Sequence, residues 1–525
     1  MRNVEDIVGE LSRCGVQLWL AGDRVRYRAP RDGLTPERLA ELKAREAEIR
    51  EFLARRSGES TAHRALIPRH AREGALPLAI AQEGLWALDQ SIPGNSFSNI
   101  FSAFSLAGAL DVPLLQRAFD EIVRRHEILR TTFVAVHGRG SQVVSGCRRP
   151  NVLIEDLRTL PAVERDVAYL RRIIREAQQP FDLAHGPLLR VLLFRIEDER
   201  HLMILTLHHI VGDAWSLQVL VLELAALYEA FAYGRQSRLP ELSVQYADYV
   251  MWQHHMLLTG ALESQLSYWR SQLGGGDFPS MALPTDYPRP ASMTFETSSR
   301  IIQLPSRLSE ALKTAGRDDG CTLFMTLVCA LVIVLHTFAK REDVRLAVLS
   351  ANRNAAQTEG MIGLFINTLL LRTDLSGDPT LRVVLQRVRD TVLGAYDNQD
   401  LPFEVIVRAL ERERHLERSS LCSVLLLFGN PTIPDVTMSG VTLQAVDVGK
   451  GLLEAGIDFN TVTTFDFIIT LAEKPQGVSG SLTYKSALFA PATVGRLLEY
   501  FRETLEQLVS RPGQRLSELP PLSGE

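Results

Sequence analysis

The sequence has few cysteines and no excess of either charge. Its five cysteines are scattered over 525 residues, and no CxxC or Cys/His cluster has the spacing of metal ligands. A disulfide scaffold and a zinc site are therefore both disfavoured. Basic and acidic residues number 57 and 62, which gives a formal net charge of −5. This balance argues against a nucleic-acid-binding protein and against a polybasic membrane anchor.

The N-terminus also lacks a secretion signal, because acidic residues stand where a signal peptide has a basic and then an apolar run. The reducing cytoplasm is the expected location. One apolar run, residues 322–339, carries no charge over 18 positions and approaches the length of a membrane span. It contains Thr322, Thr326, His336 and Thr337, and no second such run exists. These features predict a buried core helix and no membrane partner.

The composition changes once along the chain. A length of 525 residues predicts roughly three to four domains or lobes. Residues 1–56 are rich in Arg and Glu, and residues 57–75 are polar and aperiodic, which predicts a linker. From residue 76 to the end, β-rich runs alternate with helical periods. The sequence therefore predicts a small first module followed by a large α/β body.

The first module has a simple predicted order of elements. Apolar residues at helical spacing over residues 3–14 predict a helix that stops at Gly15. Two short strands around Gly22-Asp23 predict a β-hairpin. Thr35 then opens a second helix with one apolar stripe over residues 39–53. This α-β-hairpin-α unit is too small for a catalytic cleft.

The second hairpin strand carries an unusual charge pattern. A period of two places Arg24, Arg26 and Arg28 on one face. Such a strand could bind an extended acidic peptide through edge pairing and charge matching. A solvated, charged strand that prevents aggregation explains the same residues. The residues alone leave both interpretations open.

Residues 1–56 also resemble the small β-hairpin (TubC-type) docking domains that open some nonribosomal peptide synthetase subunits. The resemblance rests on residues 11–18, 22–25, 29–30 and 34–35 and on the helix of residues 39–53. It implies a partner, namely a short acidic motif at the C-terminus of an upstream subunit that carries a carrier protein.

The sharpest chemical motif is the pair His208-His209. It follows a run, residues 201–207, that predicts a buried strand. An imidazole at a strand end titrates near neutral pH and can take a proton from an attacking amine or alcohol. Adjacent strand residues point to opposite faces, so at most one of the two rings faces a given cavity. A pair of core histidines beside a capped turn explains the motif as well, and a zinc site lacks a third ligand.

The residues after the histidines favour transfer without a covalent enzyme intermediate. Gly212 allows the chain to turn back, so that Asp213 can pair with a cation or fix the loop. Ser216 lacks the GxSxG surroundings of a nucleophile and is expected to cap the helix that follows. We therefore expect direct transfer assisted by His209.

Residues 76–520 resemble the condensation domains of nonribosomal peptide synthetases, within the chloramphenicol-acetyltransferase-like superfamily. The resemblance rests on ordered motifs at residues 79–86 (AIAQEGLW), 125–133 (RHEILRTTF), 208–216 (HHIVGDAWS), 246–252 (YADYVMW), 362–368 (IGLFINT) and 397–404 (DNQDLPFE). The family usually has glycine, arginine and histidine where this chain has Ala214, Gly84 and Asn398. These three departures argue against an aminoacyl or peptidyl group as the usual acceptor. They do not affect His208 and His209.

The resemblance implies a fold and a set of roles. Two similar-sized lobes, residues 76–245 and 246–525, would form a V with a central channel. His209 would act as the general base or position the acceptor, while His208 and Asp213 would be structural, with Asp213 paired to Arg125. The loop beside them would consist of Gly212, Ala214, Trp215 and Ser216. Asn367 would lie near the channel or be purely structural.

The resemblance also implies the substrates. The donor would be an acyl or peptidyl thioester on the phosphopantetheine arm of a partner carrier protein, with no cofactor bound to the chain itself and no metal. The acceptor would be an amine or hydroxyl, on a second carrier protein or on a free small molecule, and the product an amide or ester.

The sequence shows neither an adenylation signature nor a carrier motif, so we expect either a free-standing enzyme recruited in trans by its docking domain or a fragment of a longer synthetase. Release of a chain onto a free acceptor is one interpretation. A CoA-dependent acyltransferase of the same superfamily is an alternative, although it would not need a docking module. A non-catalytic recruitment domain is another, although such relatives usually lose the second histidine.

Overall fold

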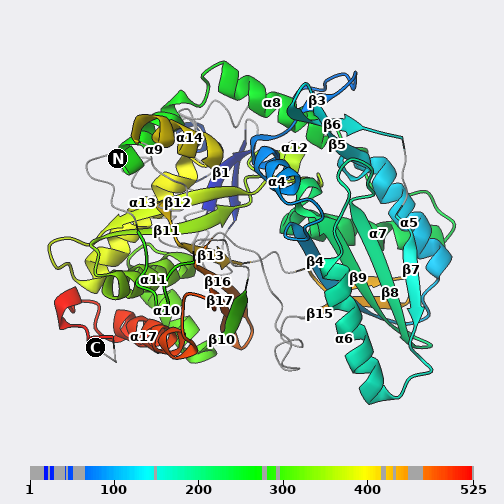
Figure 1. Cartoon of the computed structure of the whole chain (residues 1–525). Coiled ribbons are helices and arrows are strands. Elements are labelled where there is room, and N and C mark those ends of the chain that lie inside the picture. The colour runs from blue at the N-terminus through cyan, green and yellow to red at the C-terminus, as the bar shows by residue number, and fades with distance from the viewer. Residues whose placement is uncertain are drawn as a thin grey trace.

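The protein consists of two lobes, each built around a six-stranded mixed β-sheet, in a computed structural model (Figure 1). The structure describes residues 17–21, 24–28, 42, 45–50, 66–146, 150–274, 281–290, 296–414, 421–429, 433–446 and 465–522. The mixed α/β architecture and the two lobes confirm the fold predicted from the sequence. A continuous channel between the lobes stays a prediction.

The sheet of the N-lobe is covered on both faces. Its strands follow the order β14 (Val436–Met438), β15 (Val441–Val446), β4 (Asn99–Ala107), β9 (Arg200–His208), β8 (Leu189–Glu197) and β7 (Val152–Asp156). Neighbouring residues of β9 alternate between two clusters: Met203 and Leu205 pack on one face, and Leu202 and Ile204 on the other. This double burial explains why β9 is a continuous apolar run rather than an alternating one.

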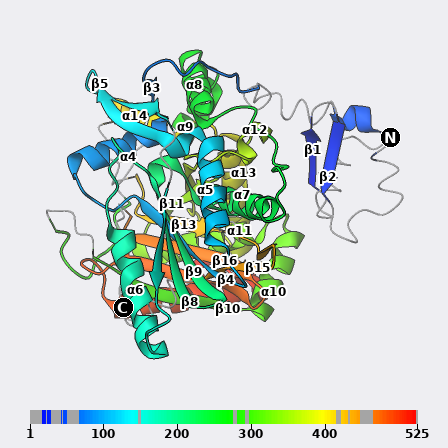
Figure 2. The same ribbon diagram turned by 90° about the vertical axis from the view of Figure 1, so that its right-hand side faces the viewer.

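Helices lie on both faces of this sheet. α6 (Ala162–Gln178) contributes Ile173 to one face, while α5 (Val112–Arg125) and α7 (Ala214–Ala232) supply the other. Figure 2 shows α5 and α6 beside strands β8 and β9. A small sheet of β3 (Leu76–Pro77), β6 (Arg139–Val144) and β5 (Thr131–Val136) lies in the same half of the chain, as do α4 (Ile80–Ser91), η2 (Glu127–Arg130) and η3 (His209–Val211).

The lobes are not contiguous in sequence. β15 pairs antiparallel with β4, with Thr442 opposite Ala107, so a segment from the C-terminal half completes the N-lobe sheet (Figure 1). Met438, Val441 and Leu443 are fully buried in the N-lobe core. The expected division at residues 245 and 246 therefore needs correction, because residues 436–446 belong to the N-lobe.

The C-lobe sheet follows the order β10 (Thr297–Pro305), β17 (Gly477–Lys485), β16 (Phe467–Lys474), β13 (Val424–Phe428), β11 (Asp343–Ser350) and β12 (Asn367–Asp374). Its helices are α9 (Glu263–Gly274), α10 (Ser306–Asp318), α11 (Leu323–Ala339), α12 (Ala356–Glu359), α13 (Leu381–Asp397), α14 (Phe403–Arg414) and α17 (Pro491–Ser510), followed by η4 (Leu516–Glu518). α8 (Tyr246–Leu258) connects the two halves of the chain and packs against both cores.

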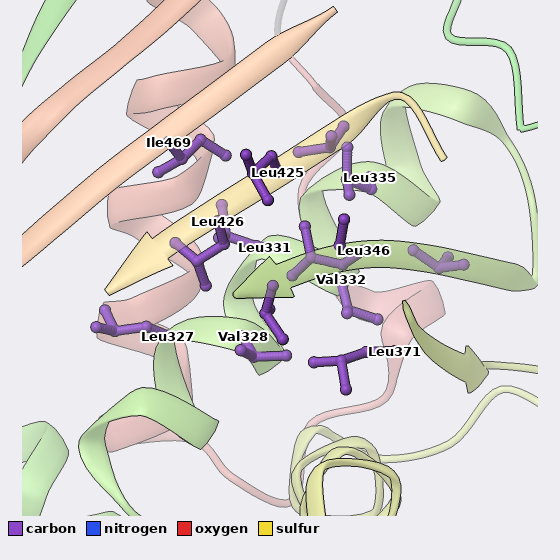
Figure 3. Packing of buried hydrophobic residues seen from close by; sticks show 14 of the residues in the cluster. Leu327, Val328, Leu331, Val332, Leu335, Leu346, Leu371, Leu425, Leu426 and Ile469 are labelled. Atoms are coloured by element: carbon purple, nitrogen blue, oxygen red, sulfur yellow. The ribbon is translucent and has the colours of Figure 1, made fainter. Parts of the chain in front are cut away.

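α11 is the buried helix predicted for residues 322–339. Thr322 caps its first turn, and the hydroxyls of Thr326 and Thr337 donate to carbonyls of the preceding turn, which satisfies these polar groups inside an apolar helix. Figure 3 shows its side chains packed against the sheet, with labels on Leu327, Val328, Leu331, Val332 and Leu335 of α11, Leu346 of β11, Leu371 of β12, Leu425 and Leu426 of β13, and Ile469 of β16. The prediction of a core helix is confirmed.

By length and composition alone, α7 is apolar enough to cross a membrane, and so is the bent pair of α10 and α11. α7 packs in the N-lobe core through residues such as Leu220, Leu224 and Leu227, all fully buried. Tertiary packing accounts for its apolar character.

The N-terminal hairpin forms as predicted. β1 (Gln17–Ala21) pairs antiparallel with β2 (Arg24–Arg28), with Ala21 opposite Arg24. Leu42 and Ile49 are buried, as the predicted apolar stripe of the second helix requires. The helix predicted for residues 3–14 and the turn at Gly22-Asp23 lie outside the described residues.

Part of the expected linker is fixed to the body. Residues 57–65 lie outside the described residues, but Arg72 donates to both carboxylate oxygens of Asp248 at 2.8 and 2.9 Å. Arg69 donates to the carbonyl of Ser243 at 2.5 Å, and the backbone N–H of Ile67 donates to Gln357 at 2.8 Å. The expected linker of residues 57–75 therefore needs correction from residue 66 onward, because Ile67, Arg69 and Arg72 are hydrogen-bonded to the body of the domain.

Candidate active site

The two adjacent histidines have different surroundings because the strand ends between them. His208 is the last residue of β9 and is buried, whereas His209 begins η3 and is partly exposed. The backbone N–H of His209 donates to the carbonyl of Ser98 at 2.7 Å, which fixes the start of the turn. The structure thus leaves one ring of the pair accessible, as predicted from the alternation of side chains along a strand.

The ring of His209 is held in one tautomer. Its Nδ1 lies 2.7 Å from the carbonyl oxygen of Gly212, and a carbonyl can only accept, so Nδ1 carries the proton. In the neutral ring, Nε2 is then the nitrogen that carries the lone pair. This is the arrangement that a general base requires.

His208 is neutral and has a structural role. Burial lowers its pKa to about 3, and the neighbouring His209 and Arg190 contribute to the same shift. Its unprotonated Nδ1 accepts the backbone N–H of Ile210 at 3.1 Å. The ring therefore supports the turn that carries His209 and does not titrate near neutral pH.

Both carboxylate oxygens of Asp213 accept hydrogen bonds from groups of the protein. Asp213 caps α7 by accepting the N–H of Ser216 at 2.8 Å and the hydroxyl of Ser216 at 2.7 Å. Its second oxygen accepts the N–H of Phe365 at 3.0 Å. Arg353 donates to it at 3.2 Å, and both side chains are almost fully buried. Asp213 therefore accepts from Ser216 in its own turn and from Arg353 and Phe365, which lie 140 and 152 residues away in the sequence.

The expected pairing of Asp213 with Arg125 is wrong. Arg125 instead donates to the carboxylate of Glu223 at 3.0 and 3.1 Å and to the carbonyl of Pro240 at 2.9 Å. Arg125 lies at the end of α5, and Glu223 lies within α7, which packs along α5. The packing of α5 along α7 thus places Arg125 beside Glu223. Asp213 lies at the start of α7, ten residues before Glu223.

Glu223 and Arg353 were both missed by the sequence reasoning. Burial raises the pKa of Glu223, but donation from His126 and Arg125 outweighs it and holds that pKa below its ordinary value. A signal for Glu223 existed, since it is the first acidic residue in the otherwise apolar α7 and a buried carboxylate needs a cation. Arg353 gives no comparable signal, because the run of residues 351–361 has no periodicity.

The remaining loop residues lie where they shape the turn. Gly212 is buried, and a Cβ there would meet the side chains of Ser216 and Leu207 at 3.3 and 3.4 Å, tighter than most such contacts. The indole N–H of Trp215 donates to the carbonyl of Glu359 at 2.9 Å. Ala214, the first residue of α7, is exposed, so its methyl group adds bulk on the open side of the loop.

The side chain of Asn367 joins the start of β12 to residues 399–403. Its amide N–H groups donate to the carbonyls of Gln399 and Leu401 at 2.7 and 2.8 Å, and its oxygen accepts the N–H of Phe403 at 2.9 Å. Asn398 lies beside this loop and donates to the carbonyl of Gly394 at 2.9 Å. A Cβ at Gly84, the third departure from the family pattern, would meet nothing within 4 Å.

A small hollow lies between α8 and residues 352–358, next to the Arg353 segment. Tyr249, Trp252 and Met256 form its apolar wall, and Asn352 and Asp400 its polar rim. Among the described residues, no group of three His, Cys, Asp or Glu side chains could hold a metal ion. The docking arginines Arg24, Arg26 and Arg28 occupy alternate positions of β2.

Comparison with known proteins adds to this geometry. The family model of the condensation domain matches residues 72–525, and that of the TubC N-terminal docking domain matches residues 4–55. The chain is 40% identical over 453 residues to one of the linear gramicidin synthase proteins of Brevibacillus parabrevis. That match covers 86% of this chain and 9% of the synthase protein, so the chain spans less than a tenth of that protein's length.

Two solved structures are similar over most of the chain. The X-domain in a complex of the X-domain and OxyB from teicoplanin biosynthesis has a TM-score of 0.73 at 26% identity, covering 88% of this chain and 99% of that one. SgcC5 of Streptomyces globisporus, in complex with (R)-(-)-1-(2-naphthyl)-1,2-ethanediol and sucrose, has a TM-score of 0.69 at 25% identity. That match covers 84% of this chain and 100% of SgcC5.

Proposed function

This chain belongs to the condensation-domain family of nonribosomal peptide synthetases and begins with a TubC-type docking domain, and we propose that it joins a carrier-bound thioester to a nucleophilic acceptor. Condensation domains form amide bonds, which is an acyltransferase reaction. The donor is an acyl or peptidyl chain on the phosphopantetheine arm of a carrier protein. The observation that carries the proposal is His209, whose accessible ring has Nδ1–H bound to Gly212 and the lone pair on Nε2.

The transfer step follows from that tautomer. The acceptor amine or hydroxyl gives its proton to Nε2 of His209 while its nitrogen or oxygen attacks the thioester carbonyl. The new C–N or C–O bond forms, the C–S bond breaks, and the departing thiolate takes the proton back from the imidazolium. The Nδ1 partner of His209 is a neutral carbonyl rather than a carboxylate. Orientation of the two reactants then supplies most of the rate.

Direct transfer is favoured over an acyl-enzyme intermediate. The hydroxyl of Ser216 lies 2.7 Å from Asp213 and 2.8 Å from the carbonyl of Gly363, and it also accepts the N–H of Gly363 at 3.1 Å. The hydroxyl is buried and fully used in these bonds. No nucleophile other than the acceptor is therefore required beside His209.

The docking domain recruits the donor in trans in this proposal. The alternate arginines of β2, Arg24, Arg26 and Arg28, fit an extended acidic motif at the C-terminus of an upstream carrier protein. A cytoplasmic location suits carrier-dependent chemistry. The free-standing role and chain release onto a free acceptor stay predictions.

A hydroxyl acceptor is the second candidate and would make the product an ester. The relative SgcC5 is in complex with an ethanediol, and its likeness to this chain supports testing alcohols alongside amines. The exposed Ala214, where the family usually has glycine, changes the open side of the His209 loop and so supports an unusual acceptor. A CoA-dependent acyltransferase is disfavoured by the docking domain, and a purely recruiting role is disfavoured by the retained His209.

The first test replaces His209 by alanine in the full chain. A loaded donor carrier is incubated with candidate amines and alcohols, and intact mass spectrometry follows loss of the acyl group and the mass of the product. We expect His209→Ala to lower turnover by about 100-fold or more. His255→Ala, which removes an exposed histidine on α8, should leave turnover unchanged. Equal turnover of both variants would refute the role of His209.

The second test concerns the docking arginines. Arg26→Glu should weaken binding of the donor carrier several-fold at low salt, and the difference should shrink as salt is added, because exposed charges are screened. Arg50→Glu makes the same charge change at an exposed position of the docking-domain helix and should have little effect. Isothermal titration at two salt concentrations measures both. Equal affinities for the two variants would leave the arginines as solvated charges.

A further inference from the structure

The C-terminal end of α6 is held by two side chains that come from the central strands of the N-lobe. The guanidinium of Arg190, on β8, donates to the carbonyls of Glu176 at 3.0 Å, Gln179 at 2.8 Å and Pro180 at 3.2 Å. The amide of Asn99, on β4, donates to the carbonyls of Ala177 and Gln179, both at 2.8 Å. A helix C-terminus presents unsatisfied carbonyls, and these donors satisfy them.

Arg190 also has a fixed charge partner. Its Nε donates to the carboxylate of Glu176, which is 2% exposed and also accepts from Arg172 at 3.1 Å. The side chain of Arg190 is itself 16% exposed. A planar guanidinium with this many fixed acceptors has little freedom to move.

Phe181 lies between this arginine and the catalytic turn. The guanidinium carbon of Arg190 lies 3.7 Å from the centre of the Phe181 ring, which is a close cation–π contact. The Phe181 ring also meets the His208 ring at 6.1 Å between centres, with the ring planes at 88°. Phe181 and His208 are both buried, so the three groups form one packed row from α6 to His208.

His208 connects this packed row to the turn that holds His209. Its Nδ1 must stay unprotonated to accept the N–H of Ile210, and that bond sets the turn in which Nδ1–H of His209 reaches the carbonyl of Gly212. The register of the sheet places Asn99 directly opposite His208, so the second support of α6 lies on the strand beside the same residue. A displaced His208 ring would loosen both bonds.

We propose that Arg190 is a positioning residue for the transfer reaction: by fixing the end of α6 and holding Phe181 against His208, it keeps the His209 ring in the orientation and tautomer that the reaction needs. The proposal rests on the proposed function of His209. Arg190 acts through Phe181 and His208 and has no contact with His209 in these bonds. Removing it should therefore reduce the rate of transfer more than it reduces binding.

A matched arginine separates this role from general stabilisation. Arg165, at the other end of α6, also has a side chain 16% exposed and donates to two carbonyls, those of Ile196 and Leu160 at 2.8 and 3.2 Å. Neither of these partners belongs to the row that ends at His208. Arg165→Gln thus removes two carbonyl bonds from the same helix without touching the row.

The experiment compares Arg190→Gln, Arg165→Gln and His209→Ala in the full chain, with a small acyl thioester as donor. We expect Arg190→Gln to lower kcat by about 10- to 100-fold, with KM for the thioester changed less than about twofold, because a misplaced reacting group costs about that much. Arg165→Gln should keep the kcat of the unmodified protein. Equal kcat for the two glutamine variants would overturn the proposal for Arg190, whereas an active His209→Ala would overturn the proposed function instead.

Two further measurements keep the test decisive if Arg190→Gln folds poorly. Phe181→Leu removes the ring and retains the arginine, and it should lower kcat as Arg190→Gln does. The double variant should then lose no more than the stronger single variant, since both act through one row, whereas independent effects would multiply. Long-range ¹H–¹⁵N spectra of labelled histidine should show a mixed tautomer for His209 in each variant, while a single tautomer would contradict the proposal.

Discussion

Asp213, which caps α7, and Arg353 form a buried ion pair between two segments that are distant in sequence. Arg353 donates to Asp213 at 3.2 Å and to the carbonyls of Thr358 and Met361 at 2.5 and 2.7 Å. Its guanidinium carbon also lies 4.0 Å from the centre of the Phe365 ring. One side chain thus ties the start of α7 to the segment that leads into β12. Removing it leaves a carboxylate in the interior with its charge uncompensated.

This pair gives a prediction about stability. Arg353→Met keeps much of the length of the side chain and should lower the free energy of unfolding by about 3–5 kcal/mol, the cost of breaking a buried ion pair. Arg382→Met breaks an exposed pair with Asp319 at 3.3 Å and should cost less than about 1 kcal/mol. Urea unfolding followed by tryptophan fluorescence measures both. A similar small loss in the two variants would show that Asp213 finds another donor.

The sequence predicted which residues surround His209 better than it predicted their partners. The expected cap by Ser216 is wrong: Asp213 is the N-cap of α7, and Ser216 lies in the first turn, where its N–H and hydroxyl donate to Asp213. The partner of Asp213 lies 140 residues further on, where only the folded sheet brings it near. The choice between Arg125 and Arg353 depended on how α5 and α7 pack, which no local pattern contains.

At the scale of elements, the segment of residues 360–366 fits tightly against α8. The hydroxyl of Tyr246 donates to the carbonyl of Leu364 at 2.7 Å, and the Tyr246 ring meets that of Phe365 at 5.2 Å between centres. A Cβ on Gly363 would overlap the Tyr246 ring. The glycine is therefore required by the close approach of backbone and ring.

Gly363→Ala should displace this segment and with it the Phe365 N–H bond to Asp213. We expect a loss of about 3 kcal/mol or more, because overpacking forces backbone shifts, together with a strong loss of turnover. Gly495→Ala in α17 is the matched control, since a Cβ there meets nothing within 4 Å. It should raise stability by up to about 1 kcal/mol. Thermal unfolding of the two variants measures both, and a tolerated Gly363→Ala would show that Tyr246 can move.

The elements that the sequence predicted well are those with a strong local pattern. The β1–β2 hairpin, the buried strand β9 and the buried helix α11 all follow from periodicity and turn residues over short windows. The position of β15 could not be predicted in this way, because its partner β4 precedes it by more than 300 residues. Its half-buried pattern is typical of many strands and does not indicate which strand it pairs with.

At the scale of the molecule, the chain connects its lobes more than once. α8 packs against both cores, β14 and β15 cross into the N-lobe sheet, and Arg408 of α14 forms an ion pair with Glu83 of α4 at 2.6 Å. The Arg408 and Glu83 side chains are largely exposed, so that pair contributes little by itself. The crossing strands are the stronger connection, since they supply core side chains to the other lobe.

A division of the chain at residues 245 and 246 should therefore fail to give a stable N-lobe. Residues 66–245 alone lack Met438, Val441 and Leu443, whose burial contributes about 5–9 kcal/mol together, comparable to the whole stability of a domain. They also leave the edge of β4 unpaired, which favours aggregation. We expect this fragment to be insoluble when expressed alone.

Restoring the missing strands should improve solubility. Residues 66–245 joined through a flexible linker to residues 433–446 should give a larger soluble fraction than residues 66–245 alone, because β4 regains its neighbour and the core regains Met438, Val441 and Leu443. The same fusion with Val441→Asp should aggregate, because it places a charge in the core. Size-exclusion chromatography of the three fragments is the measurement. A monomeric, folded fragment of residues 66–245 without β14 and β15 would show that the N-lobe folds independently of the segment that crosses into it.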